Sequence, residues 1–158
     1  MIYLGSDHGG FDLKQKVKLW LSEWGEKYED LGNKVNDSED DYPEYAIAAA
    51  RKTGESESKV REDLSWAKRD KGILICRSAV GMVIAANKIK GIRAAAVYDE
   101  QMARLCREHN DANLIGLSGD NLSDIQAKRI IRIWLDTEFA GGRHKRRLDQ
   151  IREFETGN

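Results

Sequence analysis

Cys76 is the first side chain in this sequence whose position suggests chemistry. It ends the apolar run GILIC and is followed by the small-residue loop RSAVG and the helix-like segment VIAANK. A free thiol is most often a small buried hydrophobic group. Beside the amide groups that begin a helix, however, a thiol is shifted toward the thiolate, which is the form that acts as a base. Taken alone, Cys76 is compatible with packing and with catalysis.

Histidine, acidic and arginine side chains stand at three further places. Asp7 and His8 follow the apolar run IYLG, and His109 lies in REHNDAN, just before another apolar run. A lone histidine is more often structural or solvated, but next to a carboxylate it can move a proton near neutral pH. In GGRHKRR, Arg143 and Arg147 indicate either a solvated helix start or an anion site, since guanidinium groups match phosphate geometry.

The two cysteines predict neither a disulfide framework nor a zinc site, because no CxxC or Cys/His spacing is present. Cys106 lies within a predicted helix between apolar residues, and we expect it in the core. GSDHGG lacks the GxGxxG spacing of dinucleotide sites, and no P-loop occurs. The expected ligand is therefore smaller than a nucleotide cofactor, and we expect neither a cofactor nor a metal.

Strand and helix patterns alternate along the chain. This alternation predicts an α/β, Rossmann-like three-layer sandwich with a five-stranded parallel sheet and helices on both faces. Ligands bind beyond the carboxyl ends of such strands, so we expect Asp7, His8, Cys76, Arg77 and Ser78 to meet at one rim. Strands are predicted at 2–5, 27–32, 72–76, 92–98 and 113–119, and helices at 12–24, 44–52, 83–88, 99–108, 123–136 and 143–154.

Two of the helix predictions are more detailed. The charged segment 56–71 is interpreted as a further, mostly solvated helix after a break at Gly54. In the helix at 123–136, the apolar spacing indicates that four residues face inward: Ile125, Ile130, Ile133 and Trp134.

Length and charge limit the function classes. The 158 residues fit one domain spanning 1–158. Lys and Arg number 26 against 27 acidic residues, so no overall field attracts nucleic acid. No apolar run approaches the roughly 18 residues of a membrane span, and the N-terminus has no signal-peptide pattern. We expect a cytoplasmic protein that binds neither membranes nor nucleic acid.

Six motifs occur in order over nearly the whole chain: GSDHGGFDLK, DYP, GILIC....G....ANK, GIRAA, REHNDAN and GGRH. This set resembles the ribose-5-phosphate isomerase B family, which also contains the galactose-6-phosphate isomerase subunits. The resemblance implies a homodimer, or a tetramer, with active sites shared between subunits and the helix at 143–154 packed on the partner. It also implies cofactor-free interconversion of ribose 5-phosphate and ribulose 5-phosphate, a step of the pentose phosphate pathway, through a cis-enediolate.

The resemblance further implies roles for individual residues. Cys76 is the base that moves the proton between C2 and C1, His109 opens the sugar ring, and Ser78 stands where the family has a threonine that assists the thiol. The residues implied to bind substrate are Asp7 and Asn110 at the hydroxyls, His8, Arg143 and Arg147 at the phosphate, and the backbone amides of the 77–81 loop, among them Arg77, Ala79 and Gly81, at the enediolate oxygen.

Two departures from the family pattern leave alternatives open. The loop after the cysteine usually reads Gly-Thr-Gly-x-Gly, but here Arg77 and Ala79 replace glycines, which costs energy wherever a positive φ is required. Asp120 stands where the family commonly has an arginine, so Arg77 either restores that cation or pairs with Asp120.

Two alternatives to a ribose-5-phosphate isomerase stay open. One is an isomerase of a hexose 6-phosphate, allose or galactose, and the other is a binding-only paralogue without turnover.

Overall fold

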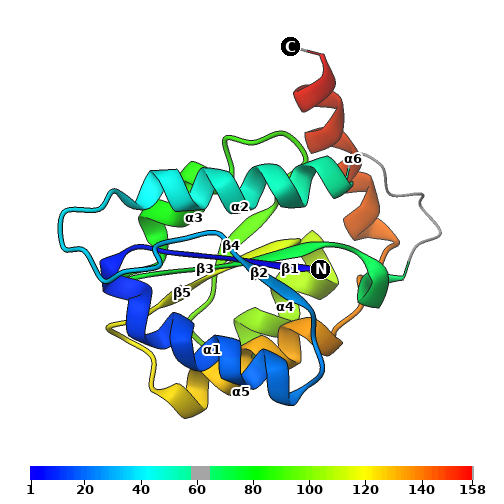
Figure 1. Cartoon of the computed structure of the whole chain (residues 1–158). Coiled ribbons are helices and arrows are strands. Elements are labelled where there is room, and N and C mark those ends of the chain that lie inside the picture. The colour runs from blue at the N-terminus through cyan, green and yellow to red at the C-terminus, as the bar shows by residue number, and fades with distance from the viewer. Residues whose placement is uncertain (58–64, 158) are drawn as a thin grey trace.

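The computed structural model describes residues 1–57 and 65–157. Its centre is an all-parallel sheet of five strands in the order β2, β1, β3, β5, β4 (Figure 1). The fold class predicted from the alternating pattern is thus confirmed. The strands are β1 (Ile2–Ser6), β2 (Tyr28–Asp30), β3 (Lys71–Cys76), β4 (Ala94–Ala96) and β5 (Leu114–Ser118).

Helices cover both faces of the sheet. In Figure 1, α2 and α3 lie on one face, and α1, α4 and α5 lie on the other. The α-helices are α1 (Phe11–Glu23), α2 (Tyr42–Glu57), α3 (Val80–Ala86), α4 (Glu100–Asn110), α5 (Asp124–Asp136) and α6 (Arg143–Thr156). None of the helices in the described part of the chain has the length and apolar character needed to cross a membrane.

The central strand β3 supplies both halves of the core. Ile73 and Ile75 belong to the cluster under α1, α4 and α5, whereas Leu74 and Cys76 belong to the cluster under α2 and α3. Successive side chains of a strand point to opposite faces, so this alternation fixes the register of β3. It also turns the Cys76 thiol toward the face that carries α3.

The direction of the connections reverses between β1 and β3. The helix after β1 is α1 and the helix after β3 is α3, and these two helices lie on opposite faces of the sheet (Figure 1). In doubly wound sheets the ligand site lies at such a reversal, beyond the carboxyl ends of the two strands. The residues that follow Ser6 and Cys76 occupy this position.

The expected break at Gly54 is wrong, because α2 continues through it to Glu57. A Cβ atom at Gly54 would lie 3.1 Å from the carbonyl oxygen of Lys90, so this glycine serves close packing. The rest of the predicted helix at 56–71 falls partly on residues 58–64, outside the described residues. Beyond them Trp66–Lys68 form a 3₁₀ turn, Trp66 is only 2% exposed, and Lys71 already belongs to β3. This part is therefore not α-helical, and although Ser65, Ala67 and Lys68 are exposed, Trp66 and Lys71 are buried.

The prediction that Ile125 faces inward is also wrong. Ile130 and Trp134 are buried as expected, and Ile133 packs against the core, but Ile125 is 66% exposed. Five residues of helix turn the side chain by roughly 500°, so Ile125 lies about 140° around α5 from Ile130. The prediction included Ile125 because it is apolar and did not take account of this angle around the helix.

Candidate active site

Three loops converge at the carboxyl ends of β1, β3 and β5. A Cβ atom at Gly10 would lie 2.1 Å from the carbonyl oxygen of Ile75, and one at Gly119 would lie 2.5 Å from that of Gly9. The Gly119 amide donates a hydrogen bond to the Cys76 carbonyl at 2.8 Å. Glycine is needed at these positions because backbone meets backbone. The rim expected from the strand pattern is therefore closely packed around Cys76.

The Cys76 thiol faces the loop that follows it. Its Sγ atom is buried and accepts a hydrogen bond from the Ala79 amide at 3.1 Å. Ala79 precedes α3 with a φ of 69°, in the left-handed region. A Cβ atom at Gly81 would lie 2.7 Å from the ring of Tyr42, which brings the first residue of α2 over the same loop. Tyr42 belongs to the DYP motif, but sequence analysis assigned it no function.

Asp7 and His8 lie on the neighbouring loop after β1. Asp7 is buried, and its Oδ1 accepts a hydrogen bond from the Gly10 amide at 3.1 Å. Burial raises the pKa of Asp7, although the nearby His8 and the amide hydrogen bonds oppose this. His8 is partly exposed, so its ring is accessible at the rim after β1.

Asp40 orients His8, and sequence analysis missed it. Its Oδ1 accepts from the His8 amide at 3.0 Å and lies 2.7 Å from Nδ1 of the His8 ring. Its Oδ2 accepts from the Asn33 side chain at 2.6 Å. This arrangement leaves Nε2 of His8 to face outward. Asp40 stands in a polar stretch without periodicity, so no sequence signal distinguished it from a solvated carboxylate.

Arg77 pairs with Asp120, which was one of the two alternatives for these departures from the family pattern. Arg77 Nη1 lies 3.6 Å from Asp120 Oδ2, with both side chains more than half exposed. The stem of Arg77 crosses Gly9, where an added Cβ would lie 2.5 Å from Arg77 Cγ. Ser78 is exposed on the loop, and its carbonyl accepts from the Tyr98 hydroxyl at 2.8 Å.

The remaining candidate residues lie at the other end of the sheet. His109 and Asn110 end α4, which leads into the amino end of β5, where the Gly72 amide donates to the Asn113 carbonyl at 2.9 Å. A five-residue strand spans roughly 13 Å between its end Cα atoms. Cys76 and His109 therefore stand at opposite ends of the strands, and one chain does not bring them together.

The end of α4 is held by an ionic cluster around Asp111. Its carboxylate pairs with Arg69 at 3.0 Å and with Arg93 and Arg107 at 2.8 Å each. Burial opposes ionisation of Asp111, but the hydrogen bonds and charges of the three arginines outweigh it and lower the pKa. Arg107 is fully buried, and its Cζ lies 3.6 Å from the centre of the Trp66 ring. The cluster fixes the turn that follows His109.

His109 stacks on a second histidine, His144, at the start of α6. The ring centres are 4.2 Å apart and the ring planes differ by 7°. Burial, then the charges of His109, Arg143 and Arg147, lower the pKa of His144. Arg143 and Arg147 are exposed beside this pair. Thus His109, Asn110 and the two arginines form one group, separate from Cys76.

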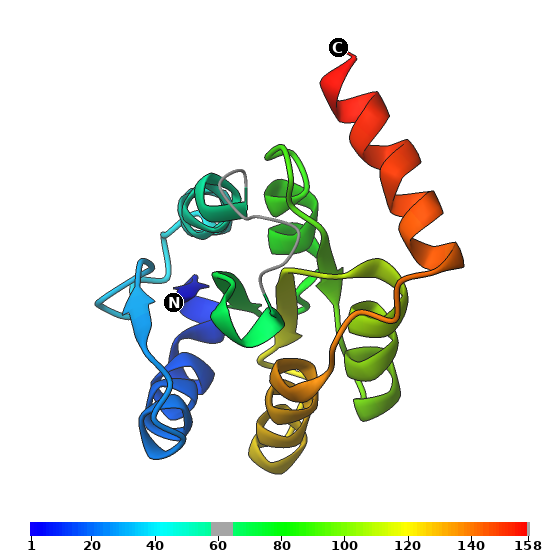
Figure 2. The same cartoon turned by 90° about the vertical axis from the view of Figure 1, so that its right-hand side faces the viewer.

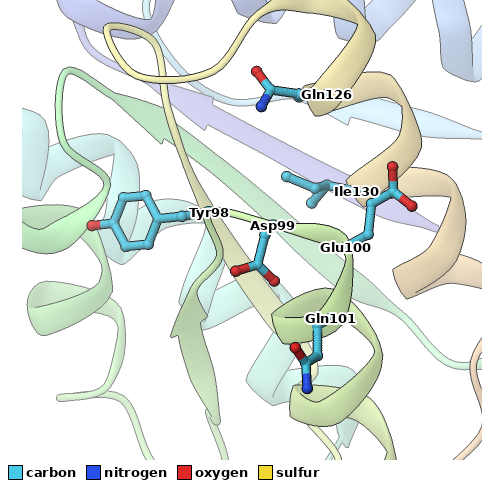
Figure 3. Close-up of a pocket in the computed structure, with 6 residues that line it drawn as sticks. All are labelled: Tyr98, Asp99, Glu100, Gln101, Gln126 and Ile130. Carbon is cyan, nitrogen blue, oxygen red and sulfur yellow. The ribbon is translucent and has the colours of Figure 1, made fainter.

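A cavity of about 380 Å³ lies elsewhere, between α4 and α5. Figure 3 shows Glu100 and Gln101 from the start of α4 on one side and Gln126 and Ile130 from α5 on the other. Asp99 and Glu100 give it an acidic wall, which disfavours a phosphate. We therefore place the candidate site at the reversal point, beyond the carboxyl ends of β1 and β3.

The second cysteine, Cys106, lies in the core. Cys106 is buried, as expected, and donates to the Ala103 carbonyl at 3.3 Å. Burial raises the pKa of this thiol to about 11, so it remains protonated and inert. Among the described residues, no group of three or more His, Cys, Asp or Glu side chains is placed to hold a metal ion.

A doubly wound sheet with a thiol, a carboxylate and an imidazole at its reversal point is typical of an α/β enzyme that acts on a small molecule. The model of the family described as Ribose/Galactose Isomerase matches residues 2–151. The chain therefore belongs to the ribose/galactose isomerase family. As a member of that family it is an isomerase of the aldose–ketose type.

Individual relatives agree with this assignment. A putative sugar phosphate isomerase of Bacillus subtilis is 38% identical over 99% of this chain and 98% of its own length. Ribose-5-phosphate isomerase B of Mycobacterium tuberculosis is 37% identical, over 98% and 89% of the two chains. Among solved structures, ribose-5-phosphate isomerase B of Mycoplasma genitalium with bound ribulose-5-phosphate is 37% identical. It superposes with a TM-score of 0.89, over 99% of this chain and 97% of that chain.

Proposed function

We propose that this protein interconverts ribose 5-phosphate and ribulose 5-phosphate without a cofactor, as a step of the pentose phosphate pathway. The observation that carries the proposal is the Cys76 thiol, which stands at the reversal point of the sheet and accepts the Ala79 amide at 3.1 Å. The substrate comes from the relatives, several of which are named ribose-5-phosphate isomerase B. One of those structures holds ribulose-5-phosphate.

The proposed reaction begins with ring opening by His109. O1 of the furanose loses a proton, the C1–O4 bond breaks, and O4 gains a proton, which gives the open aldehyde. The Cys76 thiolate then takes the proton from C2 and the charge moves onto O1. The cis-enediolate takes a proton on O1, loses one from O2, and receives the proton from Cys76 at C1, which gives the ketose. Loop amides near Cys76 stabilise the charge because they are already oriented.

The separation of the two residue groups supports a shared active site. Cys76, Asp7 and His8 lie at the carboxyl ends of the strands, and His109, Asn110, Arg143 and Arg147 lie near the amino ends. We propose that a second copy of the chain supplies the latter group, which completes the site in a homodimer, or in a tetramer built from such dimers. Ser78 assists the thiol in this scheme, and Asp7 and Asn110 bind the sugar hydroxyls.

The C-terminal helix fits this arrangement. Figure 2 shows α6 leaving the body of the molecule beside α4 and projecting beyond it. Ile151 and Phe154 on this helix are exposed, at 51% and 73%. Apolar side chains on a projecting helix are stabilised by a partner that covers them. We propose that α6 packs on the partner subunit.

Phosphate binding is proposed for His8 together with Arg143 and Arg147. Asp40 holds the His8 ring through Nδ1 at 2.7 Å, which leaves the other ring nitrogen free to face a phosphate. The ion pair with Asp120 partly neutralises the charge of Arg77. Arg77 is therefore proposed as a weaker contact to substrate.

The test is to incubate the protein with ribose 5-phosphate in D₂O and to follow ketose formation and label at C1 by NMR. We expect ketose that carries solvent deuterium, because the proton held by the Cys76 thiol exchanges with solvent. Cys76→Ala should lose at least about 10³-fold in rate, since the base is removed and no other is placed at C2. Allose 6-phosphate and galactose 6-phosphate are assayed in parallel. Turnover of a hexose phosphate alone would reassign the substrate, and binding without any turnover would leave a binding protein.

A further inference from the structure

The stacked pair of His109 and His144 is built more tightly than two surface histidines would be. The ring centres are 4.2 Å apart with planes 7° from parallel, and His144 is only 9% exposed. Within residues 1–57 and 65–157, neither ring has a hydrogen-bond partner. The stacking contact is therefore what sets the plane of the His109 ring.

Both ends of this contact are anchored. On one side, the turn after His109 is held by Asp111 and its arginines. On the other side, the Ala140 amide donates to the Glu108 carbonyl at 3.0 Å, which ties the segment before α6 to the end of α4. The His144 amide donates to the Gly141 carbonyl at 3.1 Å. The backbones of His109 and His144 therefore have little freedom to move apart.

We propose that His144 is a positioning residue for His109, an inference that rests on the ring-opening role proposed above. A group that moves protons at O1 and O4 must lie within hydrogen-bond reach of both oxygens, and misplacement by about 1 Å can cost 10²-fold. The His144 ring restricts rotation of the His109 ring. Burial and the charge of His109 lower the pKa of His144, which disfavours its protonation.

The geometry argues against a shared metal ion at this pair. The lone pairs of an imidazole lie in its ring plane, and two nearly parallel planes do not direct them at one point between the rings. Stacking is the interaction that this arrangement does provide.

The chemistry of the two sugars separates positioning from structural support. Ribose 5-phosphate is mostly a closed furanose and needs ring opening. Ribulose 5-phosphate is acyclic, because the C5 oxygen that would close its ring onto C2 carries the phosphate. Exchange of its C1 hydrogen in D₂O needs Cys76 and the enediolate site, but no ring opening. A variant that acts through His109 should therefore slow the aldose reaction and spare the ketose exchange.

The experiment compares His144→Ala, His144→Leu and His144→Phe in the full-length protein, with Arg146→Ala on the exposed side of α6 as the matched control. For His144→Ala and His144→Leu we expect kcat for ribose 5-phosphate to fall about 10- to 100-fold, with KM and ketose exchange within about threefold of the parent protein. His144→Phe retains a flat ring and should recover most of kcat. His109→Asn should be selective in the same way but lose far more activity, because it removes the ring-opening group itself.

Two results would overturn the inference. Equal losses in ring-dependent turnover and ketose exchange would show that His144 only supports the fold, and unchanged turnover in His144→Leu would show that the stack positions nothing. If the parent protein neither converts ribose 5-phosphate nor exchanges ribulose 5-phosphate, the proposed function itself fails and this inference with it. Loss of turnover in the His144 variants alone is consistent with the proposed isomerase function.

Discussion

Cys76 illustrates how a common core residue is placed for chemistry. It packs with Leu74 and Met82 on the face under α2 and α3, yet its Sγ accepts an amide hydrogen bond from the loop outside the core. That hydrogen bond depends on Ala79, whose left-handed conformation turns its N–H toward the sulfur. For an L-amino acid this conformation is less stable by roughly 1–2 kcal/mol. The chain thus carries local strain one loop away from its proposed base.

Substitution of Ala79 by glycine should reveal this strain. Ala79→Gly and Ala86→Gly each remove one fully buried methyl group, but Ala86 lies in α3 with helical geometry. Glycine relieves the strain at 79, whereas within a helix it costs about 1 kcal/mol. We expect the free energy of unfolding to fall by about 2 kcal/mol more for Ala86→Gly, measured by urea denaturation at one protein concentration. Equal losses would mean that no strain is stored at Ala79.

Among the elements, the end of α4 has the strongest electrostatic support. One carboxylate, that of Asp111, compensates three arginines and closes the helix with a φ of 46°. Asparagine also tolerates this conformation, so Asp111→Asn removes mainly the charge. Loss of one partner from a buried ionic cluster costs about 3–5 kcal/mol.

The effect of Asp111→Asn should depend on pH in a definite direction. The arginines hold the folded-state pKa of Asp111 below its unfolded value of about 4. Its contribution to stability is therefore complete above about pH 4 and is lost as the pH falls through the folded pKa. We expect the stability difference between parent and Asp111→Asn to be largest at pH 6 to 7 and to shrink toward pH 3, followed by urea denaturation at each pH.

Asp149→Asn is the matched control for that series. Asp149 pairs with Lys145 at 2.8 Å on the surface of α6, and such exposed pairs contribute about 0.3–0.5 kcal/mol. This variant should differ little from the parent at any pH. A stability difference for Asp111→Asn that stayed constant from pH 7 to pH 3 would rule out the ionic explanation.

The molecule as a whole carries the two proposed groups of site residues at opposite ends of its strands. If each active site combines Cys76 of one chain with His109 of another, two different inactive variants can restore one complete site between them. Neither Cys76→Ala nor His109→Asn alone should consume ribose 5-phosphate. After unfolding and refolding of an equal mixture, random pairing into dimers should give about one quarter of the parent activity.

Complementation has a clear negative outcome. No activity in a mixture that contains the mixed dimer, identified by native mass spectrometry, would show that the site is formed within one chain. As a control, Cys76→Ala mixed with a Cys76→Ala, His109→Asn double variant has no complete site in any pairing and should stay inactive.

Much of this molecule follows from local sequence patterns. The five strands and the helices α1, α4, α5 and α6 lie close to where the local sequence patterns predict them, and Asp99 begins α4 by accepting the Met102 amide at 2.7 Å. Periodicity and capping act over a few residues, so they can be recognised without the fold. The rim after β1 and β3 follows from the same information, because parallel strands end on the same side.

The tertiary structure decided what depends on distant residues. It made Gly54 a packing contact rather than a helix break, joined Asp40 to His8 across 32 positions, and stacked His144 on His109. Local pattern carries no information about such pairs, because packing of whole elements creates them. The sequence by itself determined which residue types could move a proton and which strand ends carry them. Only the fold decided that Cys76 and His109 stand a strand's length apart, since helix α4 returns the chain to the amino ends of the strands.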